Sequence, residues 1–122
     1  MPRVIHFEIN VDNPERATKF YSDTFGWKFQ KWGGPTEYWL VSTGEDSQPG
    51  INGGLMKRPH PGASTVNTIG VASVDDAIAT VAKNGGKVVM PKTAIPTIGW
   101  FAYCTDTEGN TFGVMQSDPN AR

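Results

Sequence analysis

The sequence is poor in several features that would each indicate a particular class of protein. Cys104 is the one cysteine among 122 residues, so the chain cannot form an internal disulfide, which suits a reducing compartment. Eleven Lys and Arg against twelve Asp and Glu leave a net charge of −1, without a basic stripe. This balance argues against nucleic acid or an anionic membrane as the main partner.

Long apolar stretches are also missing, and no run of the sequence has the length needed to span a membrane. The first residues lead directly into a strand pattern, so we expect no signal peptide and a cytoplasmic protein. Hydrophobic residues make up 38% of the chain and charged residues 19%, as in ordinary soluble proteins. A chain of this length is expected to form a single domain, residues 1–122.

The first half of the chain begins with a strand, a capped helix and a second strand. Apolar and polar residues alternate over residues 4–11, which predicts a strand with one face on the core and one polar face. Asp12 and Asn13 can both cap the following helix, and Pro14 suits its first position. Gly26 is predicted to end the helix.

The later segments read as short strands and one further helix. A Pro/Gly-rich stretch, residues 58–65, is the only plausible linker, and the S-x-x-D spacing at Ser73 predicts a second helix start. Pro91 and Pro96 indicate a turn region, and residues 117–122 are expected to be a frayed tail. The remaining strands are predicted at residues 27–29, 38–43, 51–57, 66–72, 87–90, 100–105 and 110–116.

The two halves of the chain repeat each other. Three pairs of like residues are 60 positions apart, namely Val11 with Val71, Ala17 with Ala77 and Gly26 with Gly86, and near the far end a shift of 59 fits better. The order of predicted elements agrees throughout. We therefore predict an α+β fold of two tandem β-α-β-β-β modules, residues 4–57 and 66–116.

Several motifs resemble those of the vicinal oxygen chelate superfamily, which includes glyoxalase I, bleomycin resistance proteins and extradiol dioxygenases. The resemblance covers residues 4 to 116 and is closest to short proteins related to lactoylglutathione lyase. It implies a curved mixed sheet around a cleft, with the helices outside. The motifs that carry it are His6-Phe7-Glu8-Ile9, Phe20-Tyr21, Phe25-Gly26-Trp27, Val74-Asp75-Asp76-Ala77 and Asp106-x-x-Gly109-Asn110. The short lactoylglutathione lyase-related proteins also have counterparts of Asn52-Gly53-Gly54-Leu55-Met56 and Ile98-Gly99-Trp100-Phe101-Ala102.

In metal-dependent members of this superfamily, the resemblance implies a divalent ion held by four side chains, typically His and Glu. The matching positions in this chain are His6, Gly54 (or Gly53, if the register slips by one), Val66 and Gly113. Only His6 has a ligating side chain, and a catalytic site needs about three protein ligands. We therefore expect no cofactor and no divalent metal, and no activity by the family's metal mechanism.

Strand parity predicts which side chains line the cleft instead. If His6 points inward, Glu8 and Asn10 do so as well, and the later strands add polar groups, two methionines and aromatic rings. Such a mixture suits a ligand site, although a collapsed interior has a similar composition. The predicted ligand-binding residues are His6, Glu8, Asn10, Trp39, Asn52, Met56, Thr68, Trp100, Phe101, Thr111 and Met115.

Three functions are compatible with the sequence. The first is metal-independent binding of a small apolar or aromatic molecule. The second is a lyase or isomerase in which His6 and Glu8 act as general base and its orienter, or an atypical metal site forms. The third is a homodimeric interaction module with a vestigial cleft. A purely structural His6–Glu8 pair, inherited from a metal-binding ancestor, is more common than a catalytic one. His60 is interpreted as a solvent-exposed residue and Cys104 as a buried, inert thiol.

Overall fold

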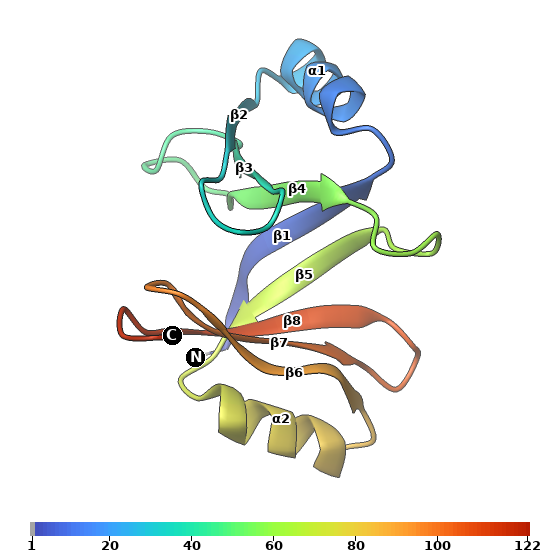
Figure 1. Cartoon of the computed structure of the whole chain (residues 1–122), viewed down its shortest axis with the longest axis vertical. Helices are drawn as coiled ribbons and strands as arrows, with labels where there is room; N and C mark the ends of the chain where they lie inside the picture. The colour runs from blue at the N-terminus through green and yellow to red at the C-terminus, as the bar shows by residue number, and fades with distance from the viewer. Residues whose placement is uncertain (1) are drawn as a thin grey trace. The chain divides into compact units, whose positions relative to one another are not determined.

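A computed structural model describes residues 2–122 of the chain. These residues contain two helices, α1 (Pro14–Phe25) and α2 (Val74–Lys83), and eight strands (Figure 1). The strands are β1 (Arg3–Val11), β2 (Lys28–Lys31), β3 (Trp39–Ser42), β4 (Gly53–Lys57), β5 (Thr65–Gly70), β6 (Lys87–Ile95), β7 (Gly99–Thr105) and β8 (Thr111–Ser117).

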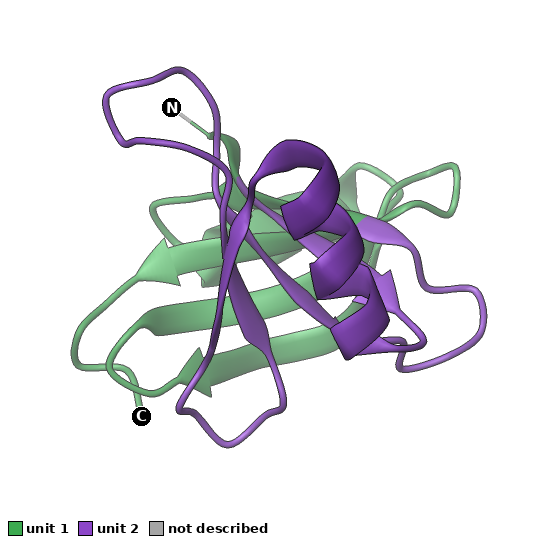
Figure 2. Cartoon of the chain, turned by 90° about the horizontal axis from the view of Figure 1, so that it is seen from above, with its two compact units in different colours: residues 1–5, 66–122 green, residues 6–65 purple. Residues whose placement is uncertain are grey.

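The chain divides into two compact units (Figure 2). Unit 2, residues 6–65, has the strand order β2-β3-β4-β1, in which β1 and β4 are parallel and the other pairs antiparallel. Unit 1, residues 1–5 and 66–122, repeats this pattern as β6-β7-β8-β5, with β5 and β8 parallel. The prediction of an α+β fold from two tandem β-α-β-β-β modules is therefore confirmed.

Both helices begin where the local sequence predicts, and α1 also ends there. The side chain of Asn13 accepts a hydrogen bond from the backbone N–H of Arg16 at 3.0 Å, and Ser73 Oγ does the same for Asp76 at 3.1 Å. These caps satisfy donors that the first helical turn leaves unpaired. Gly26 ends α1 at φ 74°, a left-handed conformation that glycine adopts without steric strain.

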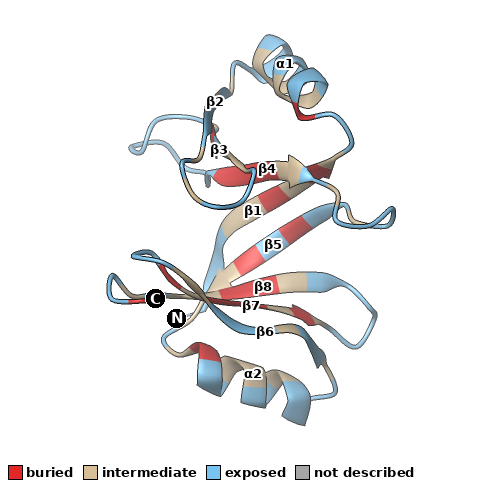
Figure 3. Cartoon of the chain, viewed as in Figure 1, coloured by how far each residue is buried: buried red, intermediate tan, exposed pale blue. Residues whose placement is uncertain are grey.

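The core of unit 1 lies between α2 and its strands. Val74, Ala102 and Val114 are buried there, and Val71 and Phe112 pack against them (Figure 3). In unit 2, Val41 and Leu55 are buried. Aromatic rings link α1 to the sheet, since Tyr21 stacks on Trp27 at 5.0 Å and the ring of Trp27 lies 6.0 Å from that of Phe7 on β1. These contacts fix which face of each strand carries the helix. The opposite face carries the polar residues considered below.

The turn region expected from Pro91 to Pro96 begins only at Pro96, because β6 continues through Pro91 to Ile95. β6 is the outer strand of unit 1, where a proline does not interrupt pairing on both sides. The pairing with β7 shifts register between Val88 and Met90 and again between Met90 and Thr93. These irregularities accommodate Pro91 within one long strand.

The prediction of a frayed tail at residues 117–122 is also wrong. The backbone N–H of Asp118 donates to the carbonyl of Ile98 at 3.0 Å, and the N–H of Thr97 donates to the carbonyl of Ala121 at 3.0 Å. The side chain of Ala121 is fully buried. Backbone pairing therefore holds the end of the chain against the segment that precedes β7.

Candidate functional site

The side chains of His6 and Glu8 meet at the hydroxyl of Tyr38. Both residues lie on β1 and point to the same face, while Tyr38 immediately precedes β3. Tyr38 Oη lies 2.8 Å from His6 Nε2 and donates to Glu8 Oε2 at 3.1 Å. His6 is half-buried and Glu8 is only 7% exposed. The result is a hydrogen-bonded chain, His6–Tyr38–Glu8, within unit 2.

This chain of hydrogen bonds determines the protonation pattern of His6. Because the single phenolic proton goes to Glu8, the Tyr38 oxygen accepts the proton carried by His6 Nε2. In the neutral imidazole the lone pair then lies on Nδ1. Burial lowers the pKa of His6 below its usual value, and the charge of Glu8 opposes this shift in part. His6 is therefore neutral at pH 7.

The ring of Tyr38 covers Gly54. Gly54 pairs with Glu8 across β1 and β4, whereas Gly53 pairs with Phe7 and so belongs to the other face. A Cβ atom at position 54 would lie 1.8 Å from Tyr38 Oη, well inside the contact distance of any two atoms. Gly54, not Gly53, therefore shares the face of His6, and the space for a side chain there is filled by Tyr38.

Unit 1 shows the same arrangement at Gly113. This glycine pairs with Thr68 on β5 and with Tyr103 on β7, and a Cβ there would lie 2.5 Å from Cζ of Phe101. Among residues 2–122, no three His, Cys, Asp or Glu side chains form a group suited to a metal ion. Since aromatic rings fill both glycine positions and Val66 has no donor, these residues do not fit the family's metal ion.

The other predicted residues of unit 2 fall into two groups. Asn10 pairs with Met56 on the face of His6 and Glu8. Trp39 instead pairs with Leu55 and lies on the opposite face, and the neighbouring Tyr38 takes the place expected for it. Asn52 accepts hydrogen bonds from the backbone and hydroxyl of Thr43, which anchors the preceding loop.

The sequence-based prediction overlooked Tyr38. Strand parity offers the signal that would have found it, because consecutive residues point to opposite faces and only one of Tyr38 and Trp39 can share the face of His6. Choosing between them required the β3–β4 register, in which Leu40 pairs with Gly54. Nothing in the sequence of the short strand alone sets that register.

In unit 1 the predicted residues also separate by face. Thr68, Phe101, Thr111 and Met115 share one face by their pairing, although Thr111 lies at its exposed end. Trp100 lies on the helix side and packs against the core around Val74. Its Nε1 donates to Asp118 Oδ2 at 3.0 Å, and the Lys92 ammonium lies 4.6 Å from the ring centroid. Trp100 is thus a structural residue in this fold.

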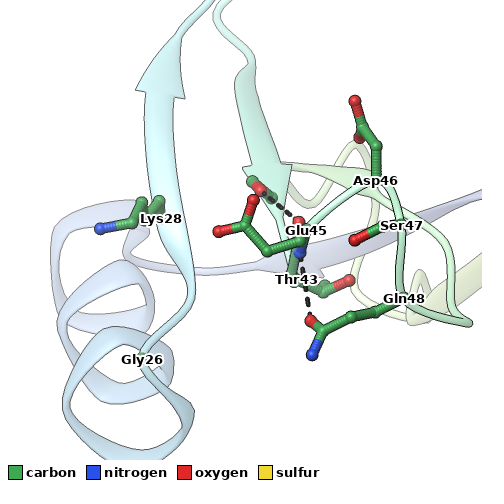
Figure 4. A pocket seen from close by; sticks show the side chains of 9 residues that line it. Gly26, Lys28, Thr43, Glu45, Asp46, Ser47 and Gln48 are labelled. Carbon is green, nitrogen blue, oxygen red and sulfur yellow. Dashed lines mark hydrogen bonds between the residues drawn. The ribbon is translucent and has the colours of Figure 1, made fainter.

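A polar hollow lies elsewhere, between the start of β2 and the loop after β3 (Figure 4). Its volume is about 690 Å³, and its lining is polar. None of the predicted ligand-binding residues lines it. The lining residues are Gly26, Lys28, Ser42, Thr43, Gly44, Glu45, Asp46, Ser47 and Gln48.

The remaining residues considered above behave as structural or solvent residues. Burial raises the pKa of the Cys104 thiol, which is fully buried and so unsuited to act as a nucleophile. His60 is exposed in the loop after β4. Neither helix in residues 2–122 has the length and apolar composition needed to cross a membrane.

Comparison with known proteins identifies the family. Residues 3–114 match the model of the Glyoxalase/Bleomycin resistance protein/Dioxygenase superfamily. The chain belongs to this superfamily. A glyoxylase-like domain-containing protein of Didymella fabae is 36% identical over 114 residues, which cover 88% of each chain. The predicted membership is therefore confirmed.

Several solved structures resemble the chain in fold. A hypothetical protein of Bacillus halodurans C-125, BH1468, superimposes with a TM-score of 0.74 at 16% identity, covering 99% of this chain and 98% of that one. A methylmalonyl-CoA epimerase in complex with methylmalonyl-CoA and ammonium gives a TM-score of 0.73 at 14% identity over the same shares. At these identities the likeness concerns the fold alone.

Proposed function

We propose that this glyoxalase-superfamily chain binds a small apolar or aromatic molecule without the divalent metal of the metal-dependent members. One observation carries the proposal: the ring of Tyr38 fills the space that a side chain at Gly54 would need. Its hydroxyl is held there by His6 and Glu8, so the ring has a defined position. A metal-ligating side chain at position 54 would have to displace it.

The face around Tyr38 suits a small organic molecule. Leu40 and Met56 contribute apolar groups through their pairing with Gly54 and Asn10, and His6, Glu8 and Asn10 contribute polar ones. Ligand sites typically combine an apolar lining with a few placed polar groups. The polar hollow beside the loop after β3 has a different character and offers no aromatic ring.

Metal analysis tests the metal-free part of the proposal. Purified protein is exposed to Zn, Ni, Mn or Fe ions, desalted and analysed by plasma mass spectrometry, with His6→Ala as the matched control. We expect far less than one metal ion per chain in both proteins. A stoichiometric metal that His6→Ala abolishes would contradict the proposal.

Protein-observed NMR tests the binding part. A panel of small apolar and aromatic compounds is titrated into the labelled chain, and we expect shifts of resonances from β1, Tyr38 and Met56. Resonances of the loop at residues 44–50 serve as the internal control and should stay in place. If no compound moves the β1 resonances at millimolar concentration, the binding proposal is wrong.

A second candidate function is metal-free lyase or isomerase chemistry at His6. The hydrogen-bonded chain His6–Tyr38–Glu8 favours it, because a neutral imidazole oriented through its Nε2–H presents Nδ1 as a base. The base would take a proton from a substrate carbon, and Glu8 would stabilise the imidazolium. Glyoxalase-type and epimerase-type assays test this function, and we expect His6→Asn and Glu8→Gln to abolish any turnover that the metal-free protein shows.

A further inference from the structure

The polar hollow between β2 and the loop after β3 is bounded by charges of both signs. Lys28 stands on one side, on β2, and Glu45 and Asp46 stand on the other, in the loop (Figure 4). All three residues belong to unit 2, so the hollow lies within one compact unit. Its volume of about 690 Å³ is that of an ordinary ligand pocket, for which roughly 300–1,000 Å³ is typical. The hollow can therefore hold a small molecule.

The loop that forms one wall of the hollow has a defined position. The N–H of Gln48 donates to the carbonyl of Glu45 at 3.0 Å, and the N–H of Glu45 donates to Gln48 Oε1 at 3.3 Å. Thr43 ties the beginning of the loop to its end. Its N–H donates to Asn52 Oδ1 at 2.9 Å, and its hydroxyl donates to the carbonyl of Ile51 at 2.7 Å. A wall that is already ordered loses less conformational entropy when a ligand binds.

The charged groups on the two sides of the hollow do not neutralise each other. Within residues 2–122, the ammonium of Lys28 and the carboxylates of Glu45 and Asp46 take part in no ion pair or hydrogen bond. Lys28 pairs with Ser42 across the sheet, whereas the two carboxylates extend from the loop beyond that strand. A molecule with a single charge can satisfy only one side. A molecule that carries a carboxylate and an ammonium group can satisfy both, through charge-assisted hydrogen bonds about twice as strong as neutral ones.

We propose that the hollow is a second binding site of this chain, for small zwitterions such as free amino acids. The carboxylate of the ligand lies against Lys28, and its ammonium group lies against Glu45 and Asp46. The separation of unpaired, opposite charges across one preformed hollow carries the proposal. It goes beyond the proposed function, because none of these residues takes part in binding at Tyr38.

Three probes with the same four-carbon chain test the proposal on the full chain: 4-aminobutyrate, butyrate and butylamine. Their dissociation constants are measured from NMR titration of the resonances of Lys28 and of residues 44–50. We expect 4-aminobutyrate to bind at least about tenfold more tightly than either singly charged probe, the factor that one further charged contact supplies. If butyrate or butylamine binds as tightly, or if none of the three shifts these resonances, the proposal is wrong. Neither result affects the proposed function, which is measured at β1, Tyr38 and Met56.

Substitutions on each side of the hollow locate the two contacts. Lys28→Met removes the ammonium and keeps most of the side-chain length. We expect it to weaken 4-aminobutyrate binding about tenfold, to the level of butylamine, without weakening butylamine binding. The double variant Glu45→Gln, Asp46→Asn should weaken 4-aminobutyrate binding to the level of butyrate.

Lys31→Met is the matched control for Lys28→Met. Lys31 lies on the same strand, but its ammonium lies 5.6 Å from the ring centroid of Trp39 and does not line the hollow. We expect Lys31→Met to keep the affinity for 4-aminobutyrate. Equal losses in the two lysine variants would show general attraction by surface charge and overturn the proposal. Full affinity in a folded Lys28→Met protein would overturn it as well.

Discussion

The two modules place an aromatic ring over a glycine at matching positions but differ in the polar groups beneath it. Leu40 and Tyr103 pair with Gly54 and Gly113, and the rings belong to residues two positions before them, Tyr38 and Phe101. In unit 2 the ring has a hydroxyl that binds His6 and Glu8. In unit 1 the ring has none.

The difference extends to the first strand of each module. Glu8 pairs with Gly54 as Thr68 pairs with Gly113, and both side chains are buried. Tyr38 donates to Glu8, whereas Thr68 Oγ1 has no partner in the described chain. The duplication has therefore retained the packing of a ring against a glycine in both modules, and only the ring of unit 2 carries a hydroxyl, which bonds to His6 and Glu8. The following predictions test this contrast.

The largest effect is expected for Gly54→Ala. The added methyl group must displace Tyr38, which overpacks the site and breaks the hydrogen bonds to His6 and Glu8. We expect a loss of about 2–4 kcal/mol in the free energy of unfolding, measured by urea denaturation. In a Tyr38→Ala background the same change should be nearly neutral. Gly33→Ala is the control, because no atom lies within 4 Å of its added Cβ. Equal losses at positions 54 and 33 would refute the packing of Tyr38.

Gly113→Ala tests the other module and should have a smaller effect. The methyl group meets the buried ring of Phe101, but no hydrogen bond of that ring is lost. Overpacking alone predicts a loss of about 1–3 kcal/mol in the free energy of unfolding. A double-mutant cycle with Phe101→Ala should show that the two changes are coupled. If the loss exceeds that of Gly54→Ala, the contrast drawn between the two modules is wrong.

The repeated fold was readily predicted from the sequence, since alternation, caps and glycines agree over both modules. Asn13, Ser73 and Gly26 mark helix ends by local chemistry, which needs no tertiary information. The full length of β6 and the ordered chain end were not predicted, because both depend on tertiary contacts and not on local chemistry. The tolerance of Pro91 depends on the outer position of its strand, and the tail is held by pairing with residues that local sequence does not identify.

The site was predicted in part for a similar physical reason. His6, Glu8 and Asn10 follow from the parity of one long alternating strand, and parity is a local property. Tyr38 and Trp39 lie at the start of a short strand, where one step of register exchanges the two faces. From the sequence alone one can see that Gly54 and Gly113 lack ligating side chains. The sequence does not show that aromatic rings occupy the space above these glycines, because this depends on side-chain packing between strands.

A change of pH tests the burial of His6. Its pKa is lowered in the folded chain, so below its usual value of 6.5 the unfolded chain takes up a proton that the folded chain resists. The free energy of unfolding should therefore fall as the pH decreases from 6.5 towards the folded pKa, with no contribution above that window. We expect a shallower fall for His6→Asn in urea denaturation at a series of pH values. His60→Asn, on an exposed loop, should keep the original slope, and the same slope in both variants would contradict burial as the cause.

The smallest effect is expected when Phe101 is given the hydroxyl that its counterpart has. Phe101 Cζ and Thr68 Oγ1 both lie against the added Cβ position of Gly113, at 2.5 and 3.2 Å. Phe101→Tyr therefore brings a donor towards a buried oxygen that has no partner. One new hydrogen bond predicts a gain of about 0.5–1 kcal/mol in the free energy of unfolding, and this gain should disappear in a Thr68→Val background. An unchanged or lower stability would mean that the space around Thr68 cannot take the hydroxyl. The two modules would then differ in shape as well as in chemistry.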